Sequence, residues 1–174
     1  MEKVILRNKL KIVSGGQTGA DRAGLDVAIN HRIPHGGWCP RGRWAEDGPL
    51  DPRYKLLETE ARRVIVRTRQ NVIDSDATLV FAFGPPVGGS RATLSFASQC
   101  KRPYLHVDLN DRDDCANARR ISRWLADIVE ERFGSEPDTE LFVLNVAGSR
   151  ESTAPGIYER VYNILANFFH EFTY

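Results

Sequence analysis

Residues 77–83, with the sequence ATLVFAF, constrain the fold more than any other part of the chain. The run is nearly continuous in apolar residues, as expected of a strand in a parallel sheet that helices cover on both faces. Shorter apolar runs at residues 10–13, 103–107 and 141–146 predict further strands. The central run therefore predicts an α/β protein built on a mostly parallel sheet.

Apolar residues at helical spacing alternate with these strands along the chain. Leu25, Ala28 and Ile29 follow the first strand at this spacing, and residues 92–100 and 121–133 repeat it. The alternation predicts one domain, residues 1–174, folded as a three-layer α/β/α sandwich. A last helix is expected to carry Ile157, Val161, Leu165 and Phe168, with Thr153 as its cap and Pro155 in its first turn. The other expected elements are a short strand at 33–38, a long loop at 39–52, a helical turn at 54–60, a strand at 63–67 and a short helix at 71–75.

Composition excludes several classes of protein. The chain has 174 residues, of which 41% are hydrophobic and 27% charged, as is ordinary for a globular domain. No apolar run approaches the roughly 20 residues of a membrane span, and the first residues are too charged for a signal peptide. The three cysteines form no CxxC pair, so neither a disulfide framework nor a zinc site is expected. The net charge of +1 gives no global attraction to nucleic acid or to an anionic membrane, so we expect a cytoplasmic protein without either partner.

Charge is distributed unevenly along the chain. Residues 1–70 carry 14 Lys and Arg against 8 Asp and Glu, whereas residues 71–140 carry 8 against 12. An anionic small-molecule ligand would therefore prefer the first half of the chain. Arginine supplies 19 of the 24 basic residues, which suits oxyanion binding, although genome base composition explains the same ratio.

Three predicted strands end in loops rich in glycine and hydroxyl residues, at 14–21, 88–93 and 148–152. In an open parallel sheet such loops gather at the carboxyl edge, where helix N-termini offer unpaired amides to an anion. Glycines that follow strands also occur in plain turns without a ligand. We expect Arg67 and Asn71 where a strand ends and a helix begins, a position that is equally compatible with ligand contact and with helix capping. The candidate ligand-binding residues are Gly15, Gly16, Gln17, Thr18, Gly19, Asp21, Arg67, Asn71, Gly88, Gly89, Ser90, Arg91, Thr93, Ser149, Arg150 and Ser152.

Two common nucleotide-binding motifs are missing from these loops. None of them matches the Walker pattern GxxxxGK[ST], because the lysine is missing. None matches GxGxxG followed by an acidic residue at the dinucleotide spacing. ATP hydrolysis and ordinary NAD binding are therefore not expected.

The sequence resembles a known family in several long motifs. SGGQTGADRAGLD, GGWCPRGRWAEDG and ETEARRVIVRTRQNVIDSDATLVF together resemble the molybdenum cofactor carriers, and GGSRAT, KRPYLHVDL and NVAGSRES extend the resemblance over most of the chain. That family is Rossmann-like and related to the lysine-decarboxylase-like phosphoribohydrolases. The resemblance implies a Rossmann-like fold and a carried ligand, the molybdenum cofactor (molybdopterin), or molybdate or tungstate. It also implies apo-molybdoenzymes or cofactor-synthesis proteins as partners.

Physical chemistry is consistent with this ligand. The cofactor is a pterin that ends in a phosphate and holds an oxo-molybdenum centre through a dithiolene, so it is anionic at both ends. Two or three anion-binding loops on one sheet edge suit such a molecule. Binding without chemistry needs only hydrogen-bond donors.

The related hydrolases carry a motif like PGGxGTxxE, whose glutamate is catalytic. This chain has VGGSRATLSF there, with apolar or hydroxyl residues in the carboxylate position. Without a placed acid or base, glycosidic cleavage loses its general catalyst, although Asp21, Asp76 and Glu151 are possible substitutes. We therefore expect no catalytic residue and a carrier that is not an enzyme. A nucleotide-derivative phosphoribohydrolase and a nucleotide-binding sensor remain the alternatives.

Metal ligation and charge near the loops leave further alternatives open. The four histidines are scattered, so no metal site of the protein's own is expected. Cys39 in GGWCP is either a direct molybdenum ligand or a small buried residue. Arg22, Arg41 and Arg43 either reach the anion or are solvated.

The last predicted helix suggests self-association. Its apolar stripe is wider than a contact with one sheet needs, so part of it would cover a second copy of the chain in a homo-oligomer. The alternative is a helix packed wholly on its own chain. The stripe consists of Tyr158, Val161, Tyr162, Leu165, Phe168, Phe169 and Phe172.

Overall fold

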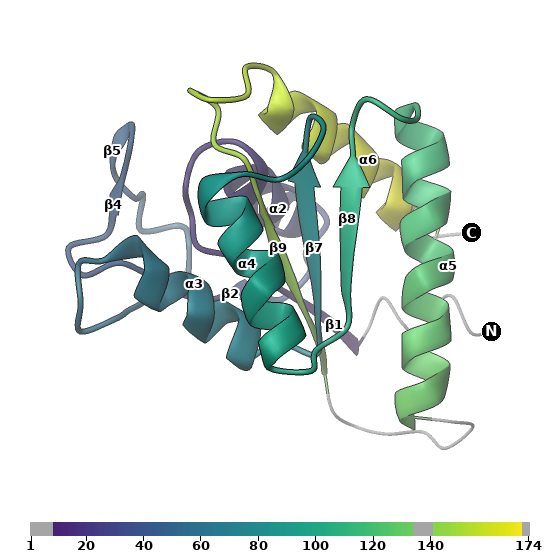
Figure 1. Cartoon of the computed structure of the whole chain (residues 1–174), viewed down its shortest axis with the longest axis horizontal. Coiled ribbons are helices and arrows are strands. Elements are labelled where there is room, and N and C mark those ends of the chain that lie inside the picture. The colour runs from purple at the N-terminus through teal and green to yellow at the C-terminus, as the bar shows by residue number, and fades with distance from the viewer. Residues whose placement is uncertain (1–8, 134–140, 172–174) are drawn as a thin grey trace.

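The central strand expected from the apolar run is β7 (Ala77–Ala82), and all six of its residues are buried. The computed structural model describes residues 9–133 and 141–171. In it β7 belongs to a five-stranded sheet of order β2-β1-β9-β7-β8, in which every neighbouring pair is parallel (Figure 1). The other strands are β1 (Leu10–Val13), β2 (His35–Gly36), β8 (Tyr104–Asp108) and β9 (Phe142–Gly148).

Helices cover both faces of this sheet. On one face, α6 (Ile157–Glu171) packs between α2 (Ala20–Asn30) and α5 (Asp114–Phe133). On the other, α3 (Val64–Ile73) lies beside α4 (Gly88–Gln99), in front of the sheet in Figure 1. The α/β/α sandwich with a mostly parallel sheet is therefore confirmed. Within the described residues, no helix combines the length and apolar character that crossing a membrane requires.

Two hydrophobic cores hold these layers. The larger lies between the sheet and the α2–α6–α5 layer, with Phe81, Phe142 and Leu144 from the strands against Ile157 and Phe168 of α6. The smaller lies beneath the segment that follows β2. It consists of Leu25, Cys39, Leu50, Tyr54 and Leu56.

The expected strand at 63–67 is wrong, because these residues begin the helix α3. The β-branched run RVIVR favours a strand locally, but that preference depends strongly on context. The buried residues that follow, Arg67, Thr68, Asn71 and Val72, recur at helical spacing, and this buried face determines the helix. The short helix expected at 71–75 is the end of α3, so Arg67 and Asn71 lie inside a helix and not at its start.

The segment from 38 to 60 is more ordered than the expected loop and helical turn. Its β3 (Trp38–Cys39) pairs in parallel with β6 (Leu57–Glu58), where the helical turn was expected. Its β4 (Trp44–Ala45) and β5 (Gly48–Pro49) form an antiparallel hairpin that projects from the body of the molecule (Figure 1). The expected strand at 33–38 is divided between β2 and β3, because Gly37 turns the chain from the main sheet with a φ of 120°.

Asp26 of α2 fastens this segment to the sandwich. Its carboxylate accepts hydrogen bonds from the hydroxyl of Tyr54 at 2.8 Å and from that of Tyr158 in α6, also at 2.8 Å. Burial and these bonds to the carboxylate raise the pKa of both phenols. The segment is therefore anchored at its base while the hairpin projects beyond it.

The apolar stripe of α6 is covered by its own chain. Val161, Leu165, Phe168 and Phe169 are buried, and α2 and α5 pack against the helix. Tyr158 and Tyr162 are half-buried with stacked rings, and Phe172 lies outside the described residues. The stripe therefore does not require a second copy of the chain, and self-association stays a prediction without this support.

Candidate functional site

The carboxyl edge of the sheet brings together the loops that follow β1, β9 and β7, because these strands are neighbours and parallel. The amide of Ala20 donates to the carbonyl of Ser149 at 3.2 Å, and the amide of Ser149 donates to Phe81 at 3.0 Å. A Cβ on Gly19 would lie 2.5 Å from the carbonyl oxygen of Ser149. The loops after β1 and β9 are therefore in close backbone contact, and the loop after β9 also bonds to the end of β7.

Most amides at the start of α2 already have acceptors within the chain. The amide of Gln17 donates to Asp21 at 3.3 Å, that of Thr18 to the side-chain oxygen of Gln17 at 3.0 Å, and that of Ala20 to Ser149. Gly16, at a φ of 75°, packs against Leu50, and Gly15 lies under Arg67. The glycines of this first loop are explained by close packing.

Asp21 and Arg67 form a buried ion pair beneath that loop. Their side chains are 3.1 Å apart, and the residues are only 3% and 8% exposed. A Cβ on Gly15 would lie 1.7 Å from Nη1 of Arg67, so glycine is needed for the guanidinium to lie there. Burial raises the pKa of Asp21, and Arg67 partly offsets this. Within the described part of the chain, Nε of Arg67 and Oγ of Ser14 are buried without a hydrogen-bond partner.

Asn71 fastens α3 to the β3 segment. Its side-chain oxygen accepts the amide of Trp38 at 2.8 Å, and its nitrogen donates to the carbonyl of Trp38 at 3.0 Å. Both ends of the Asn71 amide are therefore used inside the chain. Asn71 therefore does not cap the start of a helix, and its contact with a ligand stays a prediction.

The start of α4 is the most open of the three loops. Gly88 and Gly89 are its first two residues, and a Cβ on either would meet no atom within 4 Å. The amides of Ser90 and Arg91 bond to the carbonyl of Val87, and Thr93 Oγ1 donates to the carbonyl of Gly89 at 2.9 Å. Among the described residues, no acceptor meets the amides of Gly88 and Gly89, and the Arg91 side chain is exposed. This helix N-terminus can receive an anion without rearrangement.

The loop that follows β9 holds a carboxylate of the same chain. Ser152 donates to Glu46 through its hydroxyl at 2.6 Å and through its amide at 3.2 Å. The hydroxyl of Thr18 also donates to Glu46, and Nη1 of Arg150 lies 3.6 Å from its carboxylate. Partial burial opposes ionisation, yet the hydrogen bonds from Ser152 and Thr18 hold the pKa of Glu46 below its ordinary value.

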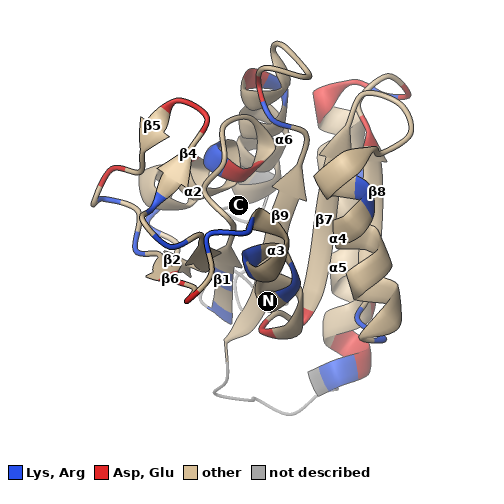
Figure 2. Cartoon of the chain, turned by 60° about the vertical axis from the view of Figure 1, so that its left-hand side comes forward, with Lys and Arg blue, Asp and Glu red and all other residues tan. Residues whose placement is uncertain are grey.

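Glu46 lies between β4 and β5, at the tip of their hairpin. Figure 2 shows that this tip is acidic. Next to Glu46, Asp47 forms two hydrogen bonds with Arg22, at 2.9 and 3.0 Å, and Gln17 accepts the amide of Glu46 at 2.9 Å. Glu46 is not among the residues that the sequence pattern predicts for the site. Its motif AEDG lies in the polar segment 39–52, and nothing local shows where that segment folds back.

The three carboxylates considered as catalytic substitutes are all engaged in the fold. Asp21 pairs with Arg67. Asp76 precedes β7, at the opposite edge of the sheet, and accepts the amide of Val143 at 2.7 Å. Glu151 accepts the amides of Gly156 and Tyr158, at 2.5 and 3.0 Å, and so caps α6. The expectation that Thr153 caps this helix is therefore wrong, since its hydroxyl donates to the carbonyl of Arg150 and α6 begins at Ile157.

Cys39, Arg41 and Arg43 lie in the segment that follows β2. Cys39 is fully buried in the smaller core, and burial raises the pKa of its thiol, which agrees with the small buried residue. Arg43 donates to the carbonyls of Asp51, Tyr54 and Leu56, and Arg41 is exposed. The described residues contain no group of three or more His, Cys, Asp or Glu that could hold a metal ion.

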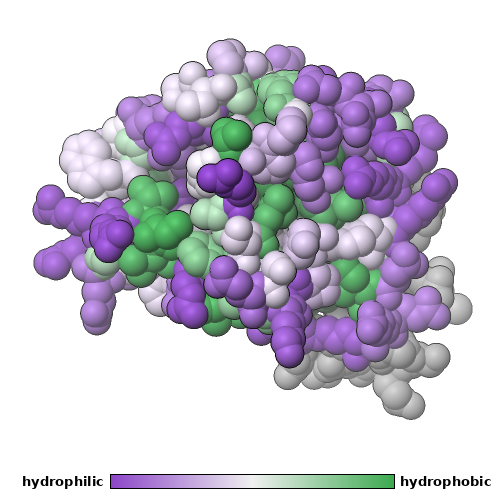
Figure 3. Space-filling model, in the orientation of Figure 1, coloured by the Kyte–Doolittle hydropathy of each residue, from purple (hydrophilic) through white to green (hydrophobic). Residues whose placement is uncertain are grey.

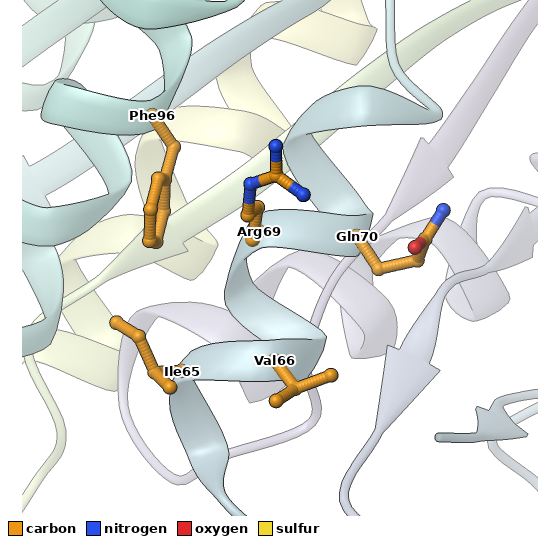
Figure 4. A pocket seen from close by; sticks show the side chains of 5 residues that line it. All are labelled: Ile65, Val66, Arg69, Gln70 and Phe96. Carbon is orange, nitrogen blue, oxygen red and sulfur yellow. The ribbon is translucent and has the colours of Figure 1, made fainter. Parts of the chain in front are cut away.

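A shallow hollow between α3 and α4 lies outside these loops. Ile65, Val66, Arg69, Gln70 and Phe96 line it (Figure 4). Apolar side chains also gather over the start of α3 in the surface view (Figure 3), where Val64, Ile65 and Val66 are exposed. None of the candidate ligand-binding residues lines this hollow.

A parallel sheet covered by helices on both faces defines a Rossmann-like α/β sandwich. Residues 12–169 match the circularly permuted YpsA SLOG family, and the chain belongs to this family. It is also similar to the crystal structure of a protein from Syntrophus aciditrophicus SB named "Putative molybdenum carrier protein". The two are 42% identical, with a TM-score of 0.84, and the match covers 92% of this chain and 95% of the other. Comparison with curated proteins gives no match. The resemblance to the molybdenum carriers and their SLOG relatives is thus confirmed.

Proposed function

We propose that this protein binds the molybdenum cofactor, protects it and releases it chemically unchanged to an acceptor such as an apo-molybdoenzyme. The similarity over almost the whole length to the Syntrophus aciditrophicus protein supports this ligand class. The open N-terminus of α4, with the unpaired amides of Gly88 and Gly89, is the observation that carries the proposal. It suits the phosphate or the molybdate end of the cofactor, and equally free molybdate or tungstate.

The number of donors is sufficient for reversible carriage. A charge-assisted hydrogen bond contributes about 1.5–3 kcal/mol. Three or four such bonds approach the roughly 8 kcal/mol of micromolar affinity, before ordering costs. The amides of Gly88 and Gly89 and the guanidinium of Arg91 can supply them without a covalent bond.

A carrier should bind the cofactor without altering it. The direct test incubates the protein with the cofactor and follows its transfer to an apo-molybdoenzyme, together with mass spectrometry and metal analysis of what co-purifies from cells that make the cofactor. We expect protected and transferable cofactor. Loss of cofactor activity at the rate seen without protein would contradict the proposal.

The second candidate function is hydrolysis of a nucleotide derivative. Glu46 favours this function, because its carboxylate lies at the carboxyl edge of the sheet although the VGGSRATLSF segment has no carboxylate. In the carrier, a panel of nucleoside monophosphates should release no free base above the buffer rate. If the wild type releases base and the Glu46→Gln variant does not, the protein is a hydrolase and not a carrier.

The open start of α4 gives a selective binding prediction. In Gly89→Asp a carboxylate stands at the unpaired amides, so we expect oxyanion affinity to fall at least tenfold by repulsion and occlusion. Gly89→Ala is the matched control and should bind as the wild type does, because its Cβ meets nothing. Calorimetric titration with molybdate and inorganic phosphate measures both variants. Equal affinity in the Asp and Ala variants would place the anion elsewhere.

A further inference from the structure

The contacts of Glu46 are those of a bound anion. Its carboxylate receives a backbone amide and a hydroxyl from Ser152, a hydroxyl from Thr18, and the guanidinium of Arg150 at 3.6 Å. These donors come from the loops after β1 and β9, which meet only in the folded chain. Amides, hydroxyls and an arginine around one pair of oxygens are the donor set of a phosphate or molybdate site.

The carboxylate in this site belongs to the tip of the β4–β5 hairpin, which has few other contacts. The strands of the β4–β5 hairpin are two residues long, Trp44 is 59% exposed, and a Cβ on Gly48 would meet nothing within 4 Å. Polar contacts hold the tip, namely those of Glu46 and the Asp47–Arg22 pair. Ala45, next to Glu46, is only partly buried against the smaller core, and Glu46 itself packs in no core, so its carboxylate can leave without opening one.

The carboxyl edge of the sheet therefore carries two sets of donors that suit an anion and that differ in character. The start of α4 is open, whereas the Glu46 carboxylate of the same chain occupies the position between Thr18, Arg150 and Ser152. A ligand that is anionic at both ends would need both positions. It would have to replace Glu46 at the second one.

We infer that Thr18, Arg150 and Ser152 form an oxyanion site that Glu46 occupies in the free protein, and that the second anionic group of the ligand exchanges with this carboxylate. The inference deepens the proposed function and rests on it for the identity of the ligand, but the site itself takes any tetrahedral oxyanion. The exchange is a competition, because the same donors serve the carboxylate and the ligand. The apparent affinity is therefore reduced by the fraction of molecules in which Glu46 is bound.

Removing the competing charge should expose the site. Glu46→Gln keeps the size of the side chain and removes its charge, so we expect the affinity for inorganic phosphate to rise about tenfold or more in calorimetric titration. Glu60→Gln is the matched control, since Glu60 is exposed in the same segment, and should leave the affinity unchanged. In Glu46→Gln/Ser152→Ala the gain should be lost, which assigns it to this site. Equal phosphate affinity in Glu46→Gln and the wild type would overturn the inference.

The wild-type protein gives a test that does not depend on a variant folding. Hydrogen exchange of residues 44–48 should speed up when saturating phosphate is added, because the tip loses its hold. Unchanged or slower exchange in these residues would contradict the exchange of Glu46. These outcomes are separate from cofactor carriage. If phosphate displaces Glu46 but the cofactor is not transferred, only the proposed function is contradicted. If the cofactor is transferred but phosphate does not displace Glu46, only this inference is contradicted.

Discussion

Arg67→Ala is expected to lower the free energy of unfolding by about 3–5 kcal/mol, because it leaves the carboxylate of Asp21 buried without its counter-ion. The two side chains are 3.1 Å apart and almost fully buried. Arg69→Ala on the exposed side of the same helix is the control, and should change stability by no more than about 0.5 kcal/mol. Urea unfolding monitored by circular dichroism measures both.

The same substitution should make stability depend on pH. Burial already raises the pKa of Asp21 in the folded state, and loss of Arg67 raises it further. The folded variant then holds a proton that the unfolded chain releases, so its stability falls as the pH rises from the ordinary pKa of the carboxyl towards the raised one. The deficit relative to the wild type should be smaller at pH 5 than at pH 8. An equal deficit at both pH values would contradict this pH dependence, and no deficit at either value would show that the pair does not stabilise the fold.

Gly37→Ala is the second substitution with a large expected effect, about 3–5 kcal/mol of unfolding free energy. Gly37 has a φ of 120°, and a Cβ there would lie 2.3 Å from the carbonyl oxygen of Ser14. The backbone strain contributes about 1–3 kcal/mol and the steric overlap a similar amount. The overlap is with the backbone directly after β1, whose amide at Ser14 is bonded to the carbonyl of Gly36.

Gly48→Ala separates the two causes. Gly48 has nearly the same φ, 114°, but its Cβ would meet nothing within 4 Å. This variant should lose only the strain contribution, about 1–3 kcal/mol. Thermal and urea unfolding of the two variants would be compared. If Gly37→Ala proved no less stable than Gly48→Ala, the steric overlap with Ser14 would contribute nothing to the loss of unfolding free energy.

These glycines also show which substitutions test ligand binding cleanly. A bulky residue at Gly16 would collide with Leu50 and Leu56 at a positive φ, so any loss of binding would be mixed with a loss of stability. Gly89 is open and has no such constraint. Binding experiments therefore belong at the start of α4, and stability experiments at Gly37.

Local pattern alone predicted the framework of this protein. The continuous apolar run of β7 could be satisfied only by burial on both faces, and the helical spacing between strands required helices to cover them. The long motifs around the glycine loops indicated the family before the fold was known. These features depend on neighbours in sequence, and the folded structure leaves them unchanged.

Tertiary contacts decided what local pattern could not. The RVIVR run became a helix because Arg67 and Asn71 had to face Asp21 and Trp38, and β-branched preference is weaker than such burial. Gly15 is required by a guanidinium from α3, far along the chain, and not by a ligand. Glu46 reaches Thr18 and Ser152 only when the hairpin folds over the edge of the sheet. The sequence by itself thus determined the layers and the predominantly parallel sheet. Which donors at the carboxyl edge of the sheet are open and which are filled follows from contacts between distant segments.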